Sequence, residues 1–279
     1  MATNRDNMDI SGKVALVTGG ANGIGKAIVE ILLRKEAQGV GIVDIDPIKG
    51  QEVTASLQKT FGDGRIVFVK CDVTSDKELK STFEDVKKKF GRLDIVCNNA
   101  GISNEYQPAK TIATNLTSVI TGTYLAVELM GTQNGGNGGV VINTASAAGL
   151  ITNPYGPVYT ATKHGVVGFS RAAAKEPKIV ENGVRVSTIC PEFVDTSFVT
   201  NAEDGVRYKA EIRKQIETLN LMPPTGVAEV VIKLIEDPQY NGCAIFVYEN
   251  NSMMVVEEPD IPILRKAGKI SKLPPSSSQ

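Results

Sequence analysis

The sequence predicts a single doubly wound α/β domain, in which a mainly parallel sheet carries helices on both faces. Short apolar runs alternate with segments of helical length, and a glycine-rich turn directly follows the first run. Six alternations of this kind are typical of a sheet built from right-handed crossovers. The chain has 279 residues, enough for one large domain with a substantial core.

The expected strands are short apolar runs of the kind that a parallel sheet buries on both faces. We expect a seven-stranded sheet from residues 14–18, 40–44, 66–71, 93–98, 140–144, 184–190 and 244–248. Helices are expected near residues 23–36, 47–60, 75–90, 107–131 and 157–176. Pro177 should end or kink the last of these, because proline cannot continue the helical hydrogen bonding.

The domain is expected to span residues 1–256. It should include a lid over the binding cleft, at about residues 193–222. Residues 257–279 are rich in Pro, Lys and Ser and predict an extended or disordered tail.

Charge and composition exclude several classes of partner. The 30 basic and 31 acidic residues leave a net charge of −1, so we expect no nucleic-acid partner. No run is apolar and long enough to span a bilayer, and no signal peptide is evident, which favours a cytoplasmic protein without a stable membrane anchor. Cys71, Cys97, Cys190 and Cys243 are widely spaced, and His164 is the only histidine. We therefore expect reduced structural thiols and no metal site.

The glycine-rich turn indicates a dinucleotide site. It joins the first expected strand to the first helix, and its candidate binding residues are Gly19, Asn22, Gly23, Ile24 and Gly25. Glycines allow the backbone to approach a pyrophosphate, which would lie at the helix N-terminus. A glycine cluster alone is weak evidence, but this position between strand and helix makes a Rossmann-type site the favoured interpretation.

Asp44 ends the second expected strand, about 20 residues after these glycines. A carboxylate there can accept hydrogen bonds from the adenosine ribose and would repel a 2′-phosphate. Ile45 and Asp46 follow, and the glycine-rich turn contains no Arg or Lys, so NAD is favoured over NADP. The alternative, a helix-capping carboxylate, better suits Asp46, which directly precedes Pro47.

Residues 71–73 follow the third expected strand and residues 99–101 follow the fourth, at the edge where open α/β sheets bind ligands. The cofactor-binding candidates there are Cys71, Asp72, Val73, Asn99, Ala100 and Gly101. Asp72 could accept the adenine amino group or cap the helix that begins near Ser75, and the sequence leaves both open. The small residues at 99–101 suit close approach to the cofactor, although an ordinary turn would also use them.

Tyr159 and Lys163 are four residues apart, on one face of an expected helix. A phenol with a pKa of about 10 is a poor base, and a nearby cation lowers that pKa. Ser146, thirteen residues before Tyr159, could hydrogen-bond the oxygen whose proton the tyrosine exchanges. Alone, the pair could be a core aromatic and a surface lysine. Because the pair follows both a nucleotide-binding turn and Ser146 in the chain, acid–base catalysis is the favoured interpretation.

These motifs, together with Asn115 and the run from Pro191 to Thr196, resemble the short-chain dehydrogenase/reductase superfamily in order and spacing, over roughly residues 13–248. Residues 115–124, 133–136 and 163–168 are most similar to the NAD-dependent 15-hydroxyprostaglandin dehydrogenase group. Insect alcohol-dehydrogenase-like proteins share this general pattern.

The resemblance implies a role for each of these residues. Tyr159 would be the general acid/base, and Ser146 would hold the substrate oxygen. Lys163 would bind the nicotinamide ribose and depress the tyrosine pKa, and Asn115 would hold a water that completes a proton relay. The contacts to the nicotinamide carboxamide would come from Val194 and Thr196.

The chain departs from the family pattern where the substrate is expected. Glu192 follows Pro191 where the family usually has Pro-Gly. Gly156, preceded by Tyr155, stands where prostaglandin dehydrogenases commonly have a substrate-binding glutamine. Tyr155, Gly156 and Glu192 therefore join Ser146 and Tyr159 as candidate substrate contacts, and the resemblance transfers prostaglandin specificity only weakly.

The predicted function is NAD-dependent oxidation of a secondary alcohol to a ketone by hydride transfer. An apolar substrate, such as a steroid, retinoid, terpenoid or eicosanoid, is expected because residues 149–158 carry no charge. Apolar side chains expected to line the lid are Phe193, Phe198, Leu219, Leu221 and Met222. The alternatives are an NADH-dependent ketone reductase and a non-catalytic binding or storage relative. The resemblance also implies a homodimer or homotetramer.

Overall fold

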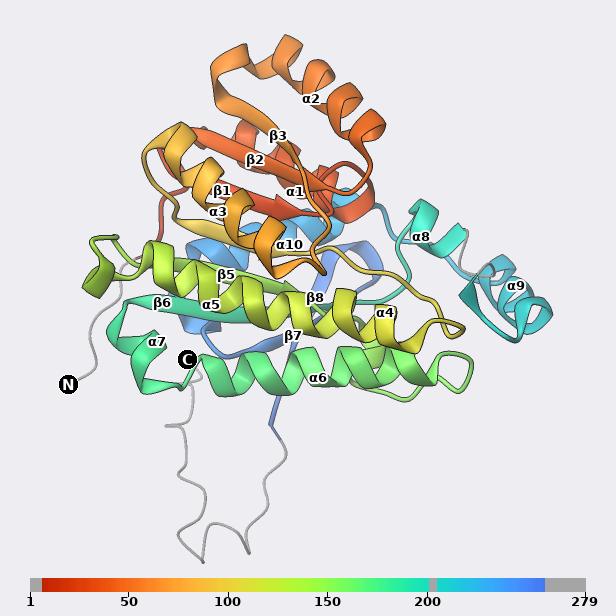
Figure 1. Ribbon diagram of the computed structural model, residues 1–279. Helices are drawn as coiled ribbons and strands as arrows, with labels where there is room; N and C mark the ends of the chain where they lie inside the picture. The colour runs from red at the N-terminus through yellow and green to blue at the C-terminus, as the bar shows by residue number, and fades with distance from the viewer. Residues whose placement is uncertain (1–6, 201–204, 259–279) are drawn as a thin grey trace, which may run out of the picture.

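The computed structural model describes residues 7–200 and 205–258, which form a sheet between two layers of helices (Figure 1). The eight strands lie in the order β3-β2-β1-β4-β5-β6-β7-β8. Their bounds are β1 Val14–Thr18, β2 Gly39–Asp44, β3 Ile66–Lys70, β4 Ile95–Asn98, β5 Gly139–Thr144, β6 Val184–Pro191, β7 Ala244–Tyr248 and β8 Ser252–Val256. The first seven run parallel, so all their carboxyl ends meet at one edge.

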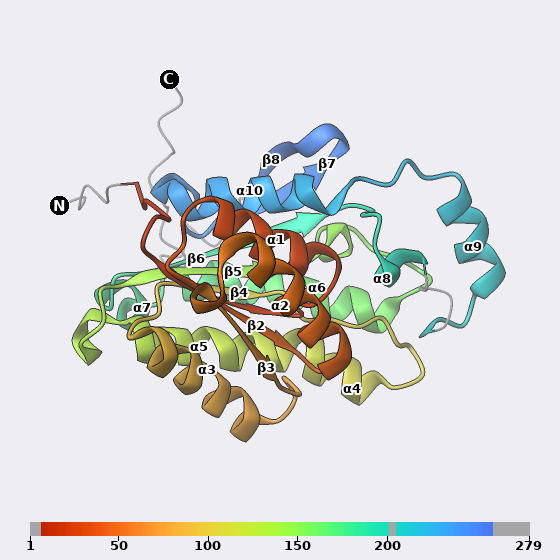
Figure 2. The ribbon, with the colours of Figure 1, turned by 90° about the horizontal axis from the view of Figure 1, so that it is seen from above.

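Helices cover both faces of the sheet. Figure 2 shows α1 and α10 side by side on one face, and α3 and α5 on the other. The helices are α1 Gly23–Arg34, α2 Pro47–Phe61, α3 Asp76–Phe90, α4 Pro108–Ile112, α5 Ser118–Met130, α6 Pro157–Ala173, α7 Pro177–Glu181, α8 Ser197–Thr200, α9 Lys209–Glu217 and α10 Pro224–Glu236. The short helices α8 and α9 project from the side of the body, at the edge where the parallel strands end.

Two apolar cores fill the space between sheet and helices. Every residue of β1 is buried, with Ala15 and Val17 packed toward α1 and α10, and Val14 and Leu16 packed toward α3 and α5. A strand buried on both faces needs a continuous apolar run, and this is the signal that predicted the parallel strands. All seven expected strands are present, within a few residues of their expected bounds.

The expected seven-stranded sheet is wrong by one strand. β8 pairs antiparallel with β7 after a single helical turn, at which Asn251 adopts φ 64°. The β8 sequence is short and shows no alternation of apolar and polar residues, and no Gly or Pro marks the turn before it. It is held by pairing with β7, a contact that its own sequence does not display.

The helix expected over residues 107–131 is interrupted. A five-residue π-helical turn, Ala113–Thr117, separates α4 from α5. Pro177 begins the short helix α7 after α6 has ended at Ala173, as predicted. Periodicity alone does not distinguish a continuous helix from one with a π-turn, because the apolar stripe continues through both.

The four cysteines are free, as expected; Cys71, Cys97 and Cys190 are buried, and Cys243 is partly buried. Burial raises the pKa of the Cys97 and Cys190 thiols to about 12, so both remain protonated at neutral pH. Among the described helices, none has the length and apolar character needed to cross a membrane. Most of the expected tail, residues 259–279, and part of the expected lid, residues 201–204, lie outside the described residues.

Candidate active site

A cavity of about 720 Å³ opens at the carboxyl ends of the parallel strands. The chain reverses its direction of strand addition between β1 and β4, and such a switch point is where open α/β sheets bind ligands. All the candidate site residues named from the sequence line this cavity, except Gly25 and Asn115. One cavity therefore joins the candidate cofactor residues to Ser146, Tyr159 and Lys163.

The turn after β1 and the turn after β4 are packed against each other. The Thr18 hydroxyl accepts hydrogen bonds from the backbone N–H groups of Asn99 (2.9 Å) and Ala100 (3.1 Å). A side chain on Gly19, where φ is 63°, would come within 3.0 Å of Ala100 Cα. Gly25 lies behind the turn, where a Cβ would meet the carbonyl oxygen of Gly19. Gly25 thus permits the turn to form and does not itself line the cavity.

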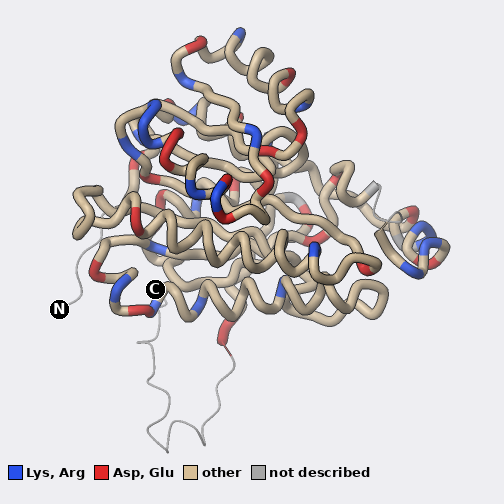
Figure 3. The backbone as a smooth tube through the Cα atoms, in the orientation of Figure 1, with Lys and Arg blue, Asp and Glu red and all other residues tan. Residues whose placement is uncertain are grey.

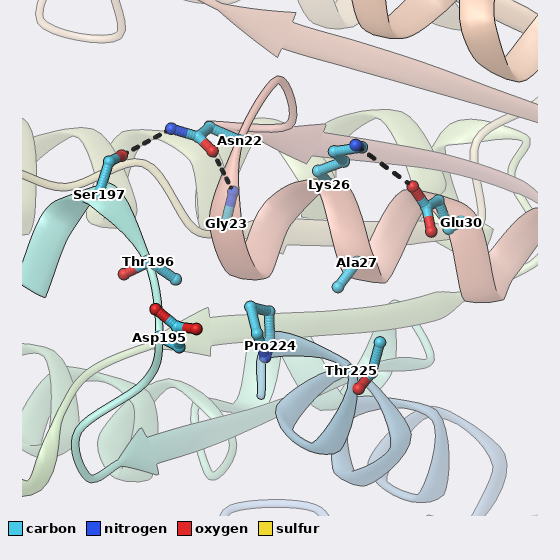
Figure 4. Close-up of a pocket in the computed structure, with 10 residues that line it drawn as sticks. All are labelled: Asn22, Gly23, Lys26, Ala27, Glu30, Asp195, Thr196, Ser197, Pro224 and Thr225. Carbon is cyan, nitrogen blue, oxygen red and sulfur yellow. Dashed lines mark hydrogen bonds and ion pairs between the residues drawn. The ribbon is translucent and has the colours of Figure 1, made fainter. Parts of the chain in front are cut away.

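Asn22 links the glycine-rich turn to the lid. Its Oδ1 caps α1 by accepting from Gly23 N (2.8 Å), and its Nδ2 donates to Ser197 Oγ (2.7 Å). Figure 4 shows this bond beside a second, open hollow of about 450 Å³, into which the Lys26–Glu30 ion pair (3.7 Å) faces. Asn22 and Ser197 both line the larger cavity as well as this hollow, so their hydrogen bond lies where the two spaces adjoin.

Asp44 sits at the end of β2 with its carboxylate toward the glycine-rich turn. Oδ2 accepts from Ala21 N (3.1 Å) and Oδ1 accepts from Asp46 N (3.1 Å). These bonds hold the carboxylate in the cavity and leave further lone pairs for a ribose diol. Asp46 caps α2 by accepting from the N–H groups of Ile48 and Lys49. The two neighbouring carboxylates thus occupy the two different positions expected from the sequence.

Asp72 is already hydrogen-bonded within its own turn. Its Oδ1 accepts from Thr74 N (2.9 Å) and from the Thr74 hydroxyl (2.7 Å), and these bonds hold its pKa below the usual value. Ser75 caps α3 by accepting from Glu78 N (3.3 Å), so the alternative that Asp72 caps this helix is wrong. Asp72 still lines the cavity, with Lys110 near enough to lower its pKa further.

Ser146, Tyr159 and Lys163 come together from β5 and α6. Ser146 lies two residues after the end of β5 and is the N-cap residue of the 3₁₀ turn Ala147–Gly149. Its Oγ accepts a hydrogen bond from Ala148 N (3.2 Å). Lys163 is buried, and its Nζ donates to the carbonyl oxygen of Thr144 (2.8 Å). The Tyr159 ring lies against Phe198 of α8, with 5.8 Å between ring centroids, which shields one side of the ring from solvent.

The expectation of a lowered Tyr159 pKa is wrong when only the groups of the protein itself act on the phenol. Burial raises the pKa of Tyr159 to about 12, although a hydrogen bond with Ser146 acts in the opposite direction. Burial also lowers the pKa of Lys163 to about 8. Removing water from a charged group disfavours its charged form, and here this cost exceeds the benefit of the neighbouring groups.

Asn115 lies in the π-helical turn, fully buried behind Gly101. Its Oδ1 accepts from Ile102 N (2.8 Å) and its Nδ2 donates to Ile102 O (2.8 Å) and Thr162 Oγ1 (3.3 Å). A Cβ on Gly101 would lie 3.4 Å from Asn115 Oδ1 and 3.6 Å from Lys163 Nζ, so Asn115 and Lys163 face the same small space. π-turns are frequent at functional sites.

The remaining cavity wall is largely apolar. Tyr155 lies 5.8 Å from the ring of Tyr208, and Gly156 precedes α6 as its N-cap residue. Phe193 and Phe198 line the cavity as expected. Lining residues that were not named individually from the sequence include Ile102, Ile151, Phe246 and, within the expected lid, Val206, Ile212 and Ile216.

The expectation that Leu219, Leu221 and Met222 line the lid is wrong, since the cavity wall includes none of them. Met222 is buried and exchanges backbone hydrogen bonds with Phe193 and Asp195, 2.9 and 2.8 Å long. It therefore supports the strand-like segment that carries Val194.

Glu105 is a site residue that the sequence interpretation missed. Its buried carboxylate accepts from the N–H groups of Val158 (3.0 Å) and Tyr159 (2.9 Å) at the start of α6. One signal was available: α6 begins with Gly156-Pro157, and no side chain there can cap the helix. The free N–H groups required an acceptor from elsewhere in the chain, but the sequence did not say which.

The chain is similar to known proteins over most of its length. A family model described as short chain dehydrogenase matches residues 13–207. The 15-hydroxyprostaglandin dehydrogenase (NAD⁺) of Mus musculus is 41% identical over 266 residues, covering 93% of this chain and 98% of the relative. The Homo sapiens protein of the same name is 44% identical over 241 residues, covering 84% of this chain and 90% of the relative. Alcohol dehydrogenase 1 of Ceratitis cosyra is 31% identical, covering 76% and 82%.

Solved structures share the fold. Levodione reductase superposes with a TM-score of 0.75 at 25% identity, covering 85% of this chain and 96% of the other. A short chain dehydrogenase/reductase from Burkholderia phymatum superposes with a TM-score of 0.72 at 23% identity, covering 82% and 87%.

Proposed function

Because the chain belongs to the short-chain dehydrogenase family, we propose that it oxidises a secondary alcohol on an apolar substrate to the ketone, with Tyr159 as general base. The observation that carries this proposal is the shared cavity, in which Ser146, Tyr159 and Lys163 face the same space as the glycine-rich turn and Asp44. At the coarser level the chain is an NAD-dependent oxidoreductase that acts on CH–OH groups.

The residues at the sheet edge fit a dinucleotide. The turn after β1 is free of side chains that would block a pyrophosphate, and it opens helix α1, whose first N–H groups suit an anion. The Asp44 carboxylate faces the cavity, and each of its oxygens can accept a further hydrogen bond, as the two hydroxyls of a ribose diol require. The bound NAD supplies the hydride acceptor, and the protein supplies orientation and proton transfer.

The proton steps follow from the positions of three side chains. Ser146 would donate its hydroxyl hydrogen to the substrate oxygen and hold it against Tyr159. The phenolate of Tyr159 would then accept the alcohol proton as the C–H bond breaks. Lys163, as a cation, favours that phenolate. Asn115, which faces the same small space as Lys163, would hold a water that connects Lys163 to solvent.

The substrate end of the cavity favours an apolar molecule without a carboxylate near the reacting carbon. Its described wall includes Ile102, Ile151, Phe198 and Ile216, which suit a hydrocarbon skeleton. Glu192 is the only carboxylate lining the described cavity apart from Asp44 and Asp72 at the cofactor end. No other described residue forms an ion pair with Glu192.

A ketone reductase is the second candidate function, and the state of Tyr159 favours it. With its pKa raised to about 12, Tyr159 is protonated at neutral pH, which is the form that would give a proton to a ketone. Both directions use the same residues. A non-catalytic relative is the third alternative, and the presence of Ser146, Tyr159 and Lys163 in one cavity argues against it.

Turnover by the purified full-length chain tests these functions. NAD⁺ is supplied with a panel of secondary alcohols, and NADH with the matching ketones, while absorbance at the NADH wavelength is followed. Faster oxidation of apolar alcohols supports the first proposal, and faster reduction at equal cofactor concentration supports the second. Tight NAD⁺ binding without turnover in either direction would leave the non-catalytic function.

A homodimer or homotetramer remains a prediction. The helices α5 and α6 carry few charges, in contrast with α2, α3 and α9 (Figure 3). Tyr124 on α5 is 46% exposed and stacks edge-on against Phe169 of α6. An exposed aromatic on a weakly charged helix pair suits contact with another copy. Light scattering of the purified chain would give the mass of the assembly.

A further inference from the structure

We propose that Glu105 is a positioning residue that fixes the helix carrying Tyr159 and Lys163 and couples it to the lid. The inference rests on the proposed function, since it assigns Glu105 to the same reaction. Glu105 lies in the loop of residues 102–106, between β4 and α4, and does not contact the reacting atoms. It acts through the backbone of α6 on one side and through the backbone of residues 205–206 on the other.

The Glu105 side chain performs the capping that α6 lacks locally. Only 3% of the residue is exposed, and its two carboxylate oxygens each accept one N–H, from Val158 at 3.0 Å and from Tyr159 at 2.9 Å. Gly156, the N-cap residue, has no side chain to offer. A carboxylate at this end also meets the positive end of the helix dipole. The bond to Tyr159 N fixes the backbone from which the catalytic phenol projects.

The backbone of the same loop holds the lid. Glu105 N donates to Gly205 O (2.7 Å), and the Tyr106 hydroxyl donates to Val206 O (3.3 Å). Gly205 lies so close to Ser103 that a Cβ there would overlap the Ser103 carbonyl oxygen. Val206 lines the cavity. The lid segment therefore cannot shift at residues 205–206 without moving the loop.

The other end of the loop is tied to the catalytic helix as well. Asn115 bonds both the N–H and the carbonyl of Ile102, at 2.8 Å each, and donates to Thr162, which directly precedes Lys163. The loop is thus bound to the helices at Ile102 and at Glu105. Its contacts with the lid are made by the Glu105 N–H and the Tyr106 hydroxyl. A substrate that contacts the lid at residues 205–206 would therefore also affect the position of Glu105, and through it the backbone of Tyr159.

A cap that contributes only to stability is the competing explanation, and Asp94 provides a matched control. Asp94 is equally buried (2% exposed), accepts from Val14 N (2.9 Å) and pairs with Arg92 (2.7 Å). It lies just before β4, at the opposite edge of the sheet from the cavity. Replacing Asp94 should weaken the fold by a comparable mechanism without touching α6 or the lid.

The test compares Glu105→Ala, Glu105→Gln and Asp94→Asn in the full chain with NAD⁺ and an alcohol that the wild type oxidises. Glu105→Ala should lower kcat about 10- to 100-fold and raise the KM for alcohol, because small displacements of a reacting group have effects of this size. The Kd for NAD⁺ should stay within about twofold of wild type, since the cofactor end is untouched. Glu105→Gln keeps one acceptor oxygen and should fall between. Asp94→Asn should lower Tm and leave kcat and KM near wild type.

Hydrogen–deuterium exchange supplies a readout that does not need turnover. In the Glu105 variants, exchange should accelerate together in residues 157–163 and in residues 205–212, and in neither segment of Asp94→Asn. Unchanged kcat and KM in Glu105→Ala and Glu105→Gln, with only a lowered Tm, would overturn the inference. If Glu105→Ala does not fold, Glu105→Gln carries the same test. Wild-type protein that oxidises none of the alcohols refutes the proposed function. If the wild type is active but its Glu105 variants do not accelerate exchange in both segments, the role of Glu105 alone is refuted.

Discussion

The Lys163 ammonium lies 5.4 Å from the centre of the Tyr159 ring, and burial shifts the two groups in opposite directions. The pKa of Tyr159 rises to about 12 and the pKa of Lys163 falls to about 8. At neutral pH the tyrosine is therefore a neutral phenol beside a largely charged lysine. A second positive charge in the cavity, as on the oxidised nicotinamide ring, would favour the phenolate that alcohol oxidation requires.

Tyr159→Phe removes the proposed base and keeps the ring that packs against Phe198. We expect kcat to fall at least about 100-fold, the usual contribution of general acid–base catalysis, with the Kd for NAD⁺ nearly unchanged. Steady-state kinetics and cofactor fluorescence measure the two quantities. Tyr240→Phe, at a position outside the described cavity wall, is the matched control and should retain kcat. Substantial turnover by Tyr159→Phe would rule out the base assignment.

Lys163 should impose a pH dependence on stability. Its pKa falls from 10.5 in the unfolded chain to about 8 in the folded chain, because of burial. Between these values the unfolded state binds more protons, so this residue makes the free energy of unfolding rise as pH increases from 8 to 10.5. The full effect is about 3 kcal/mol, at about 1.4 kcal/mol per pH unit.

Urea unfolding of wild type and Lys163→Met across this pH range measures the effect. The difference between the two proteins should grow with pH, because the other titrating groups are common to both. Lys80→Met, at an exposed position on α3, should follow the wild type. Parallel curves for wild type and Lys163→Met would contradict the lowered pKa.

Asp44→Asn removes the charge at the end of β2 and keeps the shape of the side chain. The ratio of kcat/KM for NADP⁺ to that for NAD⁺ should rise about tenfold, equivalent to about 1.4 kcal/mol, because a 2′-phosphate no longer meets a carboxylate. Asp46→Asn is the control: it removes the neighbouring charge, keeps a side chain that can cap α2, and should leave the cofactor preference as it is. An unchanged preference in Asp44→Asn would refute the ribose role.

Glu192 should select against substrates that carry a carboxylate inside the cavity. For a hydroxy acid and its methyl ester, wild type should favour the ester, and Glu192→Gln should reduce that preference about tenfold by removing like-charge repulsion. The ratio of the two kcat/KM values is the measurement. Glu217→Gln, exposed on α9 outside the cavity, controls for net charge. Equal ratios in wild type and Glu192→Gln would remove Glu192 from specificity.

Local patterns were sufficient to predict most of the fold and many of the residues that line the cavity. Val14–Thr18 and its counterparts are apolar throughout because parallel strands are buried on both faces, and that pattern is visible in a short window. Motif spacing likewise indicated that Ser146, Tyr159 and Lys163 would meet. Motif spacing does not predict how burial changes a pKa. The Tyr-x-x-x-Lys pair predicted a lowered tyrosine pKa, but burial raises it.

By itself the sequence determined the α/β class and the seven parallel strands, and it predicted the dinucleotide turn and the acid–base residues, because these features show in short sequence motifs. Only the tertiary structure decided the antiparallel β8, the π-turn at Asn115 and the capping of α6 by Glu105. The cap of α6 joins positions 54 apart in the chain, and the π-turn is held by bonds from Asn115 to Ile102 and Thr162. β8 pairs with the neighbouring β7, but its own residues show no strand pattern. Burial and the pairing of groups in space are properties of the assembled fold, and the sequence motifs did not predict them.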